Sequence, residues 1–129
     1  LYRQFQTMFA DYDVLITPGQ PITPTPVEQR NVTEVNNVPM KNYMHASALT
    51  SALTLMGNPC VSTPCGVDHT GMPFGFQICG PMHGDAFTLG VARALERVFM
   101  RDPELARPVP NLAKLRASDE GFEAIKPVK

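Results

Sequence analysis

Two short apolar segments, each bounded by glycine and proline, constrain the fold of this chain most strongly. Residues 57–66 have the sequence GNPCVSTPCG, and residues 71–80 have the sequence GMPFGFQICG. Short apolar runs between Gly and Pro are typical of buried strands that end in fixed turns. Because the connection over residues 66–73 is too short for a helical crossover, we expect strands at 60–63 and 74–79 to run antiparallel.

Helices and one further strand are predicted around this pair. Residues 1–10, 42–56 and 86–99 carry apolar side chains at helical spacing, and Asp85 is a candidate N-cap for the last of these helices. Residues 14–17 have the sequence VLIT, a continuous apolar run that indicates a central strand buried on both faces. The expected buried face of the helix over 86–99 consists of Phe87, Val91, Leu95 and Val98.

Proline shapes the remaining segments. Residues 19–40 contain several prolines, so we expect no regular structure there and an extended path over the surface; loops of this length are often functional or mobile. Residues 101–129 are Pro-rich and charged, with a short helix expected at 111–117. We therefore expect 1–100 to form one domain segment and 101–129 a tail. The element order predicts an α/β fold whose three strands form one edge of a larger mixed sheet flanked by helices.

Composition argues against several classes of protein. The formal net charge is −1 and no basic run is present, so nucleic acid is not an expected partner. The longest apolar stretch, residues 46–56, is too short to span a membrane. There is no signal-peptide pattern and no initiator Met, so we expect a piece of a longer protein. Three cysteines, an odd number, indicate reduced, buried thiols and a cytoplasmic location.

Candidate reactive side chains are few. We expect the Ser62 hydroxyl to bond nearby backbone at a strand end rather than to act as a nucleophile. Cys65 and His69 could form a thiol–imidazole pair, but no residue is placed to orient the imidazole, which favours a buried thiol beside a surface histidine. The histidines His45, His69 and His83 are scattered, so no metal site is predicted. The glycines form no phosphate-binding loop, and no cofactor is predicted.

The two glycine-bounded strands resemble the C-terminal signature of the amidase signature family of serine hydrolases. The family pattern is roughly G-x-P-x-[IV]-S-x-P-x-G and, after a short loop, G-[LM]-P-x-G-[LF]-Q-[IL]-x-G; nearly every position matches. Residues 13–18 (DVLITP) are similar to the family's D-x-L-[LIV]-x-P strand, and the resemblance covers roughly residues 9–99. It implies an α/β fold with a mixed central sheet and helices on both sides. It also implies hydrolysis of a carboxylic amide through an acyl-serine intermediate, without metal or ATP.

The groups that perform this reaction in the family have no counterpart in this sequence. The family's nucleophilic serine lies in a Gly-Ser-rich loop and is activated by a second serine and a lysine, all upstream of the signature. We therefore assign no catalytic residue, and we expect a C-terminal fragment of an amidase that is inactive alone. Its implied partners are a small-molecule amide and the missing N-terminal part of the amidase. Bare strand edges also predict self-association or marginal stability.

The resemblance further implies substrate-binding roles for Thr17, Ser47 and Gln77, although Gln77 could instead serve buried backbone groups. The family includes general amidases and the glutaminase subunit of glutamyl-tRNA amidotransferase, in which an acidic residue upstream of the signature helps to hold the glutamine amino group. Ser47 occupies that position and Thr54 replaces the usual Asn, and both departures weaken the glutaminase hypothesis. Two alternatives remain: a non-catalytic interaction module derived from the fold, and an independent thiol enzyme that uses Cys65.

Overall fold

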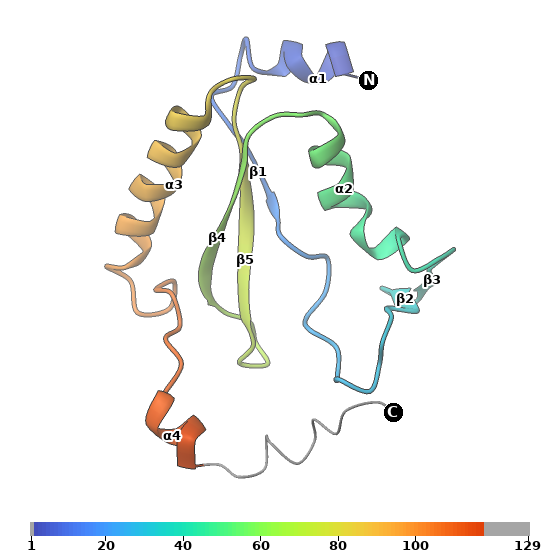
Figure 1. Ribbon diagram of the computed structural model, residues 1–129, viewed down its shortest axis with the longest axis vertical. Coiled ribbons are helices and arrows are strands. Elements are labelled where there is room, and N and C mark those ends of the chain that lie inside the picture. The colour runs from blue at the N-terminus through green and yellow to red at the C-terminus, as the bar shows by residue number, and fades with distance from the viewer. Residues whose placement is uncertain (1, 118–129) are drawn as a thin grey trace.

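The structure is a computed structural model that describes residues 2–117. In chain order its elements are α1 (Tyr2–Met8), β1 (Leu15–Pro18), β2 (Glu34–Val35), β3 (Val38–Pro39), the 3-10 helix η1 (His45–Ser47), α2 (Ala48–Leu55), β4 (Cys60–Val67), β5 (Pro73–Cys79), α3 (Asp85–Phe99) and α4 (Leu112–Ala117). Figure 1 shows the main sheet at the centre, with α3 on one side, α2 on the other and α1 across one end. Helices around a central sheet confirm the predicted α/β class.

Three strands form an antiparallel sheet in the order β1-β5-β4. The predicted antiparallel pairing of the two glycine-bounded segments is confirmed, since β4 and β5 pair directly. The prediction that residues 14–17 form a central strand is wrong. β5 occupies the middle and β1 an edge, where Ile16 is 52% exposed. Within residues 2–117 both pairings of this sheet are antiparallel, so the parallel component of the implied mixed sheet is not seen in this part of the chain.

α3 packs against one face of the sheet through small side chains. Thr88 and Ala92 are its buried residues. A Cβ atom on Gly80 would overlap the Thr88 side chain, so the helix lies very close to the end of β5. Further along, the ring of Phe76 on β5 meets that of Phe99 edge-on, with centroids 5.6 Å apart. The helix is therefore held at both of its ends.

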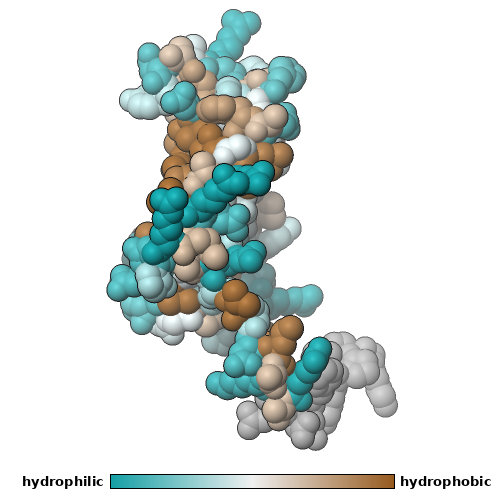
Figure 2. All heavy atoms as spheres, turned by 90° about the vertical axis from the view of Figure 1, so that its left-hand side faces the viewer, coloured by the Kyte–Doolittle hydropathy of each residue, from teal (hydrophilic) through white to brown (hydrophobic). Residues whose placement is uncertain are grey.

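The buried face predicted for this helix is only partly correct. Val91 and Leu95 are half-buried, but Phe87 and Val98 are 46% and 56% exposed. The small side chains that permit the close approach take the innermost positions, which turns these two larger side chains outward. Figure 2 looks onto this side of the molecule and shows apolar atoms gathered over its upper half.

Two helices begin at different residues from those predicted. The helix expected at 42–56 starts later, because η1 precedes α2. It is followed as expected by Gly57, whose φ is +74°. α3 starts at Asp85 with Gly84 in the N-cap position and no capping side-chain hydrogen bond, so the predicted N-cap role of Asp85 is wrong. The Asp85 carboxylate lies in the first turn, where the helix dipole favours a negative charge.

The segment over residues 19–40 is not wholly irregular, contrary to expectation. β2 pairs with β3 across Asn36 and Asn37, whose φ angles are +51° and +62°. Two successive residues with positive φ are typical of the tightest hairpin turns, and asparagine tolerates this conformation. The long loop therefore contains a small ribbon of its own.

The first part of the tail lies against the sheet. Gly66 has a φ of +61°, and a Cβ atom there would meet the carbonyl group of Glu104. The short helix expected in the tail forms as α4. Residues 118–129 lie outside the described part, and the division of the chain at residue 100 stays a prediction.

The three cysteines differ in exposure. Cys65 and Cys79 are buried, as predicted for reduced thiols, but Cys60 is exposed. The prediction is wrong for Cys60 because it begins β4, which lies at an edge of the sheet.

Candidate functional site

Three polar side chains form one row across the sheet. Gln77 of β5 lies opposite Thr17 of β1 on one side and opposite Ser62 of β4 on the other. Paired residues of neighbouring strands project from the same face. Phe76 precedes Gln77 and contacts Phe99 of α3, so the row projects from the face opposite α3. The structure thus brings together two of the three predicted substrate-binding residues.

Two atoms of this row are buried without a hydrogen-bond partner. Thr17 Oγ1 and Gln77 Oε1 are inaccessible to solvent and unpaired within residues 2–117. Leaving a polar group buried and unpaired costs about 1–3 kcal/mol, so native proteins retain few such groups. No backbone N–H of the described chain reaches Gln77 Oε1, so within residues 2–117 this oxygen bonds no buried backbone group. Both atoms are free to pair with a ligand or with another part of a larger protein.

Two serines singled out in the sequence lie in different surroundings. Ser62 completes the row but is exposed, and within the described segment its hydroxyl makes no hydrogen bond to the backbone. Ser47 lies apart from the row, at the junction of η1 and α2, where its carbonyl accepts a hydrogen bond from the Thr50 hydroxyl at 3.0 Å. No hydrogen bond in the described residues joins Ser47 to Thr17 or Gln77. Substrate binding by these residues stays a prediction.

A cavity of about 1160 Å³ adjoins the row. Thr17 and Ser62 line it, together with residues 18–25, which follow β1. Leu95 and Phe99 of α3 contribute apolar lining at the other side. The volume exceeds the roughly 300–1,000 Å³ typical of ligand pockets. The loop that was expected to be functional or mobile therefore forms one wall of this cavity.

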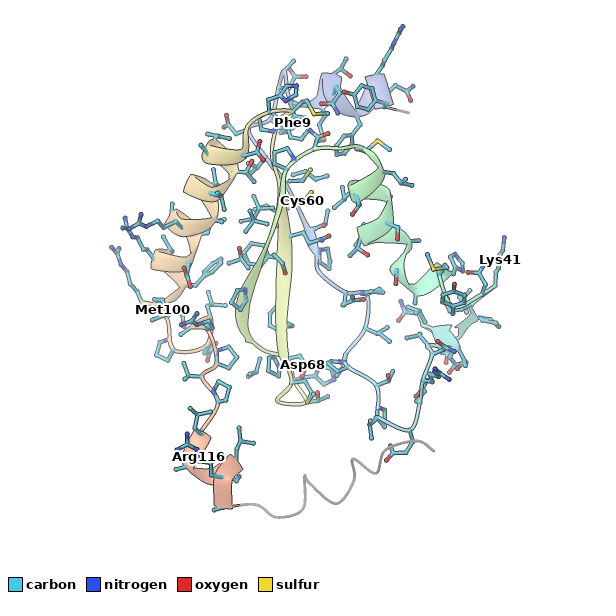
Figure 3. The ribbon with its side chains drawn as sticks, in the orientation of Figure 1. Phe9, Lys41, Cys60, Asp68, Met100 and Arg116 are labelled. Carbon is cyan, nitrogen blue, oxygen red and sulfur yellow. The ribbon has the colours of Figure 1, made fainter. Side chains whose placement is uncertain are left out.

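Asp68 fastens this wall to the turn between β4 and β5. Its carboxylate accepts hydrogen bonds from the hydroxyls of Thr70 (2.6 Å) and Thr23 (2.7 Å) and from the backbone N–H groups of Thr70 (2.8 Å) and Met72 (3.0 Å). These bonds, that of the Thr70 hydroxyl foremost, hold the pKa of the Asp68 carboxyl well below its usual range. Figure 3 shows Asp68 at the end of the hairpin opposite Cys60.

Sequence reasoning missed Asp68, because the turn was treated only as a surface loop. A signal was available: Asp68 stands two residues before Thr70 and three before Gly71. Asp in such a turn commonly bonds backbone N–H groups further along the chain. The contact with Thr23 has no signal of this kind, since it joins segments far apart in the sequence.

A second network fastens the opposite end of the hairpin. Asn58 is buried, and its Nδ2 donates to the Gly80 carbonyl at 2.8 Å and to Gln6 Oε1 at 3.3 Å. Its Oδ1 accepts from Gln6 Nε2 at 2.6 Å. These bonds join α1 to the beginning of β4 and the end of β5. The polar row therefore lies between two fixed ends.

Two other arrangements were considered from the sequence, a thiol–imidazole pair and a metal site. Cys65 is 6% exposed and His69 lies on the surface, as the favoured interpretation has it. In the part of the chain that the structure covers, no His, Cys, Asp and Glu side chains gather in a group of three or more that could hold a metal ion. No helix of the same residues has the length and apolar character needed to cross a membrane.

The fold and the spacing of the two glycine-bounded strands have a counterpart among known proteins. The sequence pattern of the amidase family matches residues 1–89, and the chain belongs to that family.

Curated relatives include the A subunit of glutamyl-tRNA(Gln) amidotransferase from several bacteria. The protein of Brevibacillus brevis is 36% identical over 110 residues, which make up 83% of this chain and 21% of that protein. The protein of Bacillus cereus is 40% identical over 95 residues, which make up 74% of this chain and 18% of that protein. The chain therefore spans about one fifth of the length of these relatives.

Solved structures show the same fold. The A subunit of glutamyl-tRNA(Gln) amidotransferase from Thermotoga maritima matches with a TM-score of 0.65 and 23% identity, over 84% of this chain and 22% of that one. A chain from a vestigial protein complex, described as revealing the evolutionary origins of an s-triazine catabolic enzyme, matches with a TM-score of 0.66 and 24% identity. It covers 84% of this chain and 24% of its own. At these identities the likeness concerns the fold.

Proposed function

We propose that this chain is the C-terminal part of an amidase-family enzyme that hydrolyses a carboxylic amide. The observation that carries this proposal is the family match over residues 1–89, which contain the whole of the row Thr17–Gln77–Ser62. In the proposed reaction, a serine activated by a second serine and a lysine attacks the amide and forms an acyl-serine intermediate. Those three groups belong to the remainder of the longer protein, and the chain alone is inactive.

The proposed role of this chain is to form part of the substrate pocket. The unpaired Thr17 Oγ1 and Gln77 Oε1 support this role, because both atoms lack a hydrogen-bond partner and Thr17 itself lines a cavity of about 1160 Å³. This volume is larger than that of an ordinary ligand pocket, and we expect the rest of the protein to cover part of the cavity and reduce it. The small-molecule partner is an amide, and the macromolecular partner is the N-terminal part of the same enzyme. A cytoplasmic location is supported by the three cysteines, none of which is in a disulfide.

An open strand edge supports the proposed N-terminal partner. Along the β4–β5 ladder, Val61 and Thr63 direct their backbone groups toward β5, which leaves those of Cys60 and Ser62 on the outer side of β4. No strand within residues 2–117 pairs with that side. Unpaired edges of this kind bind further strands. A neighbouring strand of the complete sheet is the occupant that this proposal assigns to the edge.

The test of the proposal uses the longer protein encoded by the reading frame that contains these 129 residues. Its upstream part should encode a Gly-Ser-rich loop and an earlier lysine, and the purified protein should release ammonia from primary amides. An upstream sequence without these groups, or a protein with them that releases no ammonia from any amide, contradicts the proposal. The first result would favour a non-catalytic interaction module instead.

Glutamine is a second candidate substrate, because the relatives are named as amidotransferase subunits. An uncharged Ser47 gives the glutamine ammonium no ionic partner. We therefore expect the longer protein to prefer simple primary amides, and Ser47→Asp to shift the preference toward glutamine. Ser51→Asp, on the adjoining helix α2, is the matched control and should leave the preference unchanged. Efficient glutamine hydrolysis by the unmodified protein would favour the glutaminase alternative.

A further inference from the structure

Two cysteines lie directly opposite each other on β4 and β5. Cys60 and Cys79 are partners in the register of this pairing. The next pair along the ladder is Pro59 and Gly80. The N–H of Gly80 donates to the carbonyl of Pro59 at 2.9 Å, so this pair is a hydrogen-bonded one. Since hydrogen-bonded and non-hydrogen-bonded pairs alternate in an antiparallel ladder, the cysteines form a non-hydrogen-bonded pair, in which Cα atoms are about 4.5 Å apart. Disulfide-bonded cysteines have Cα atoms roughly 4.4–6.8 Å apart.

The two thiols differ in environment. Cys60 is exposed, whereas Cys79 has 0% of its surface exposed. Burial, and after it the neighbouring Cys60 thiol, raise the pKa of the Cys79 thiol to about 12. The direct pairing of the two residues across the ladder makes their side chains neighbours. The third cysteine, Cys65, lies where the ladder becomes irregular and has no cysteine opposite it.

We propose that Cys60 and Cys79 form a dithiol that a low-molecular-weight disulfide oxidises to a cross-strand disulfide. The Cys60 thiolate attacks one sulfur of the small disulfide, which forms a mixed disulfide and expels one thiolate. The Cys79 sulfur then attacks the Cys60 sulfur and expels the second thiolate. The two protons lost by the cysteines go to the two released thiolates. The cysteine pair is thereby oxidised by two electrons, and the small disulfide is reduced to two thiols.

Exposure sets the order of these steps. Only Cys60 is accessible to a molecule from solvent, so it reacts first. Cys79 needs no access to solvent, because its target is the sulfur of its direct neighbour across the ladder. Its weak acidity makes the second step the slower one, so a mixed disulfide at Cys60 should precede the cross-link.

The cross-link would lie beside the polar row of the candidate site. Cys60 is two residues from Ser62, and Cys79 is two residues from Gln77, so both pairs project from one face of the sheet. A bond there fixes β4 against β5 in the native register and should raise the urea concentration at which the chain unfolds. This proposal depends on the strand register and on the exposure of Cys60, and it stands apart from the proposed amide hydrolysis.

The test exposes the whole 129-residue chain to glutathione disulfide, quenches with acid, alkylates the remaining thiols and cleaves after methionine with cyanogen bromide. Cleavage after Met72 separates Cys79 from the other two cysteines. The expected product is fragment 57–72 joined to fragment 73–82, with the loss of two hydrogens. Cys65→Ala should give the same product, and Cys60→Ala should give none. The oxidised chain should unfold at a higher urea concentration than the reduced chain.

A parallel oxidation in strong urea provides the control for unspecific pairing. In the unfolded chain the short spacing between Cys60 and Cys65 favours their bond, so the products should differ between the two conditions. The same pairing with and without urea would overturn the proposal. A glutathione adduct that persists on Cys60, or a bond between Cys60 and Cys65 under native conditions, would overturn it equally.

Discussion

At the residue scale, removing the unpaired hydroxyl of Thr17 tests whether this group stabilises the fold or is instead available to bind a ligand. Thr17→Val keeps the shape of the side chain and removes the buried, unpaired oxygen. We expect the variant to be neutral or more stable by up to about 1 kcal/mol in urea unfolding, because no hydrogen bond is lost. The matched control is Thr88→Val, which loses a bond to the Gly84 carbonyl at 2.8 Å and should cost about 1 kcal/mol. Equal losses for the two variants would contradict the assignment.

A second prediction at this scale concerns acid. The hydrogen bonds to Asp68 lower its pKa from the ordinary value of 3.8 in the folded chain. The ionised carboxylate therefore adds stability that is fully present above the unfolded pKa and is lost as the pH falls toward the folded one. Asp68→Asn should be less stable than the parent chain near neutral pH, and the difference should shrink below about pH 4. Urea unfolding of both chains across this range checks it; a difference that does not change with pH would contradict it.

At the element scale, two glycines next to or within α3 should respond in opposite ways to the same change. Gly80→Ala places a Cβ against the buried Thr88 side chain and should destabilise the chain by about 1–3 kcal/mol through overpacking. Gly90→Ala adds a Cβ in open space on the exposed side of the helix and should stabilise by up to about 1 kcal/mol. Thermal or urea unfolding of the two variants checks the prediction. A tolerated Gly80→Ala would show that α3 does not rest on the end of β5.

The elements also show what the sequence predicts and what it does not. The β4–β5 hairpin was predictable because Gly and Pro mark both ends of each strand and the connection is short. The edge position of β1 was not, because strand order depends on long-range pairing with β5. The buried face of α3 was mispredicted because the contact between Gly80 and Thr88 favours small side chains over Phe87 and Val98.

The candidate site, too, was predictable from the sequence only in part. Thr17 and Gln77 could be named from the family pattern, but their pairing in one row follows only from the strand register. The turn around Asp68 was predictable from its neighbours Thr70 and Gly71 in the sequence. The hydrogen bond between Thr23 and Asp68 was not predictable from the sequence, since that contact forms only when the loop after β1 folds back onto the hairpin.

At the scale of the whole molecule, exposed apolar surface and open strand edges predict association. Ile16, Phe87 and Val98 are about half exposed, and the outer side of β4 has no strand beside it in the described residues. Such surfaces recruit other chains. We expect the isolated chain either to self-associate or to unfold with a shallow transition. Sedimentation at dilute concentration, with a urea melt, tests this; a monomer with a steep transition would favour a free-standing module.

The most direct test of the central claim, that this chain belongs to an amidase without containing its catalytic groups, is an amide hydrolysis assay of the purified 129 residues. Loss of nucleophile and base together typically removes about a million-fold of rate. We predict no release of ammonia or arylamine above buffer from a primary amide or a simple arylamide. Turnover at ordinary enzymatic rates that Ser62→Ala or Cys65→Ala abolishes would contradict the account, because the catalytic nucleophile would then lie within this chain.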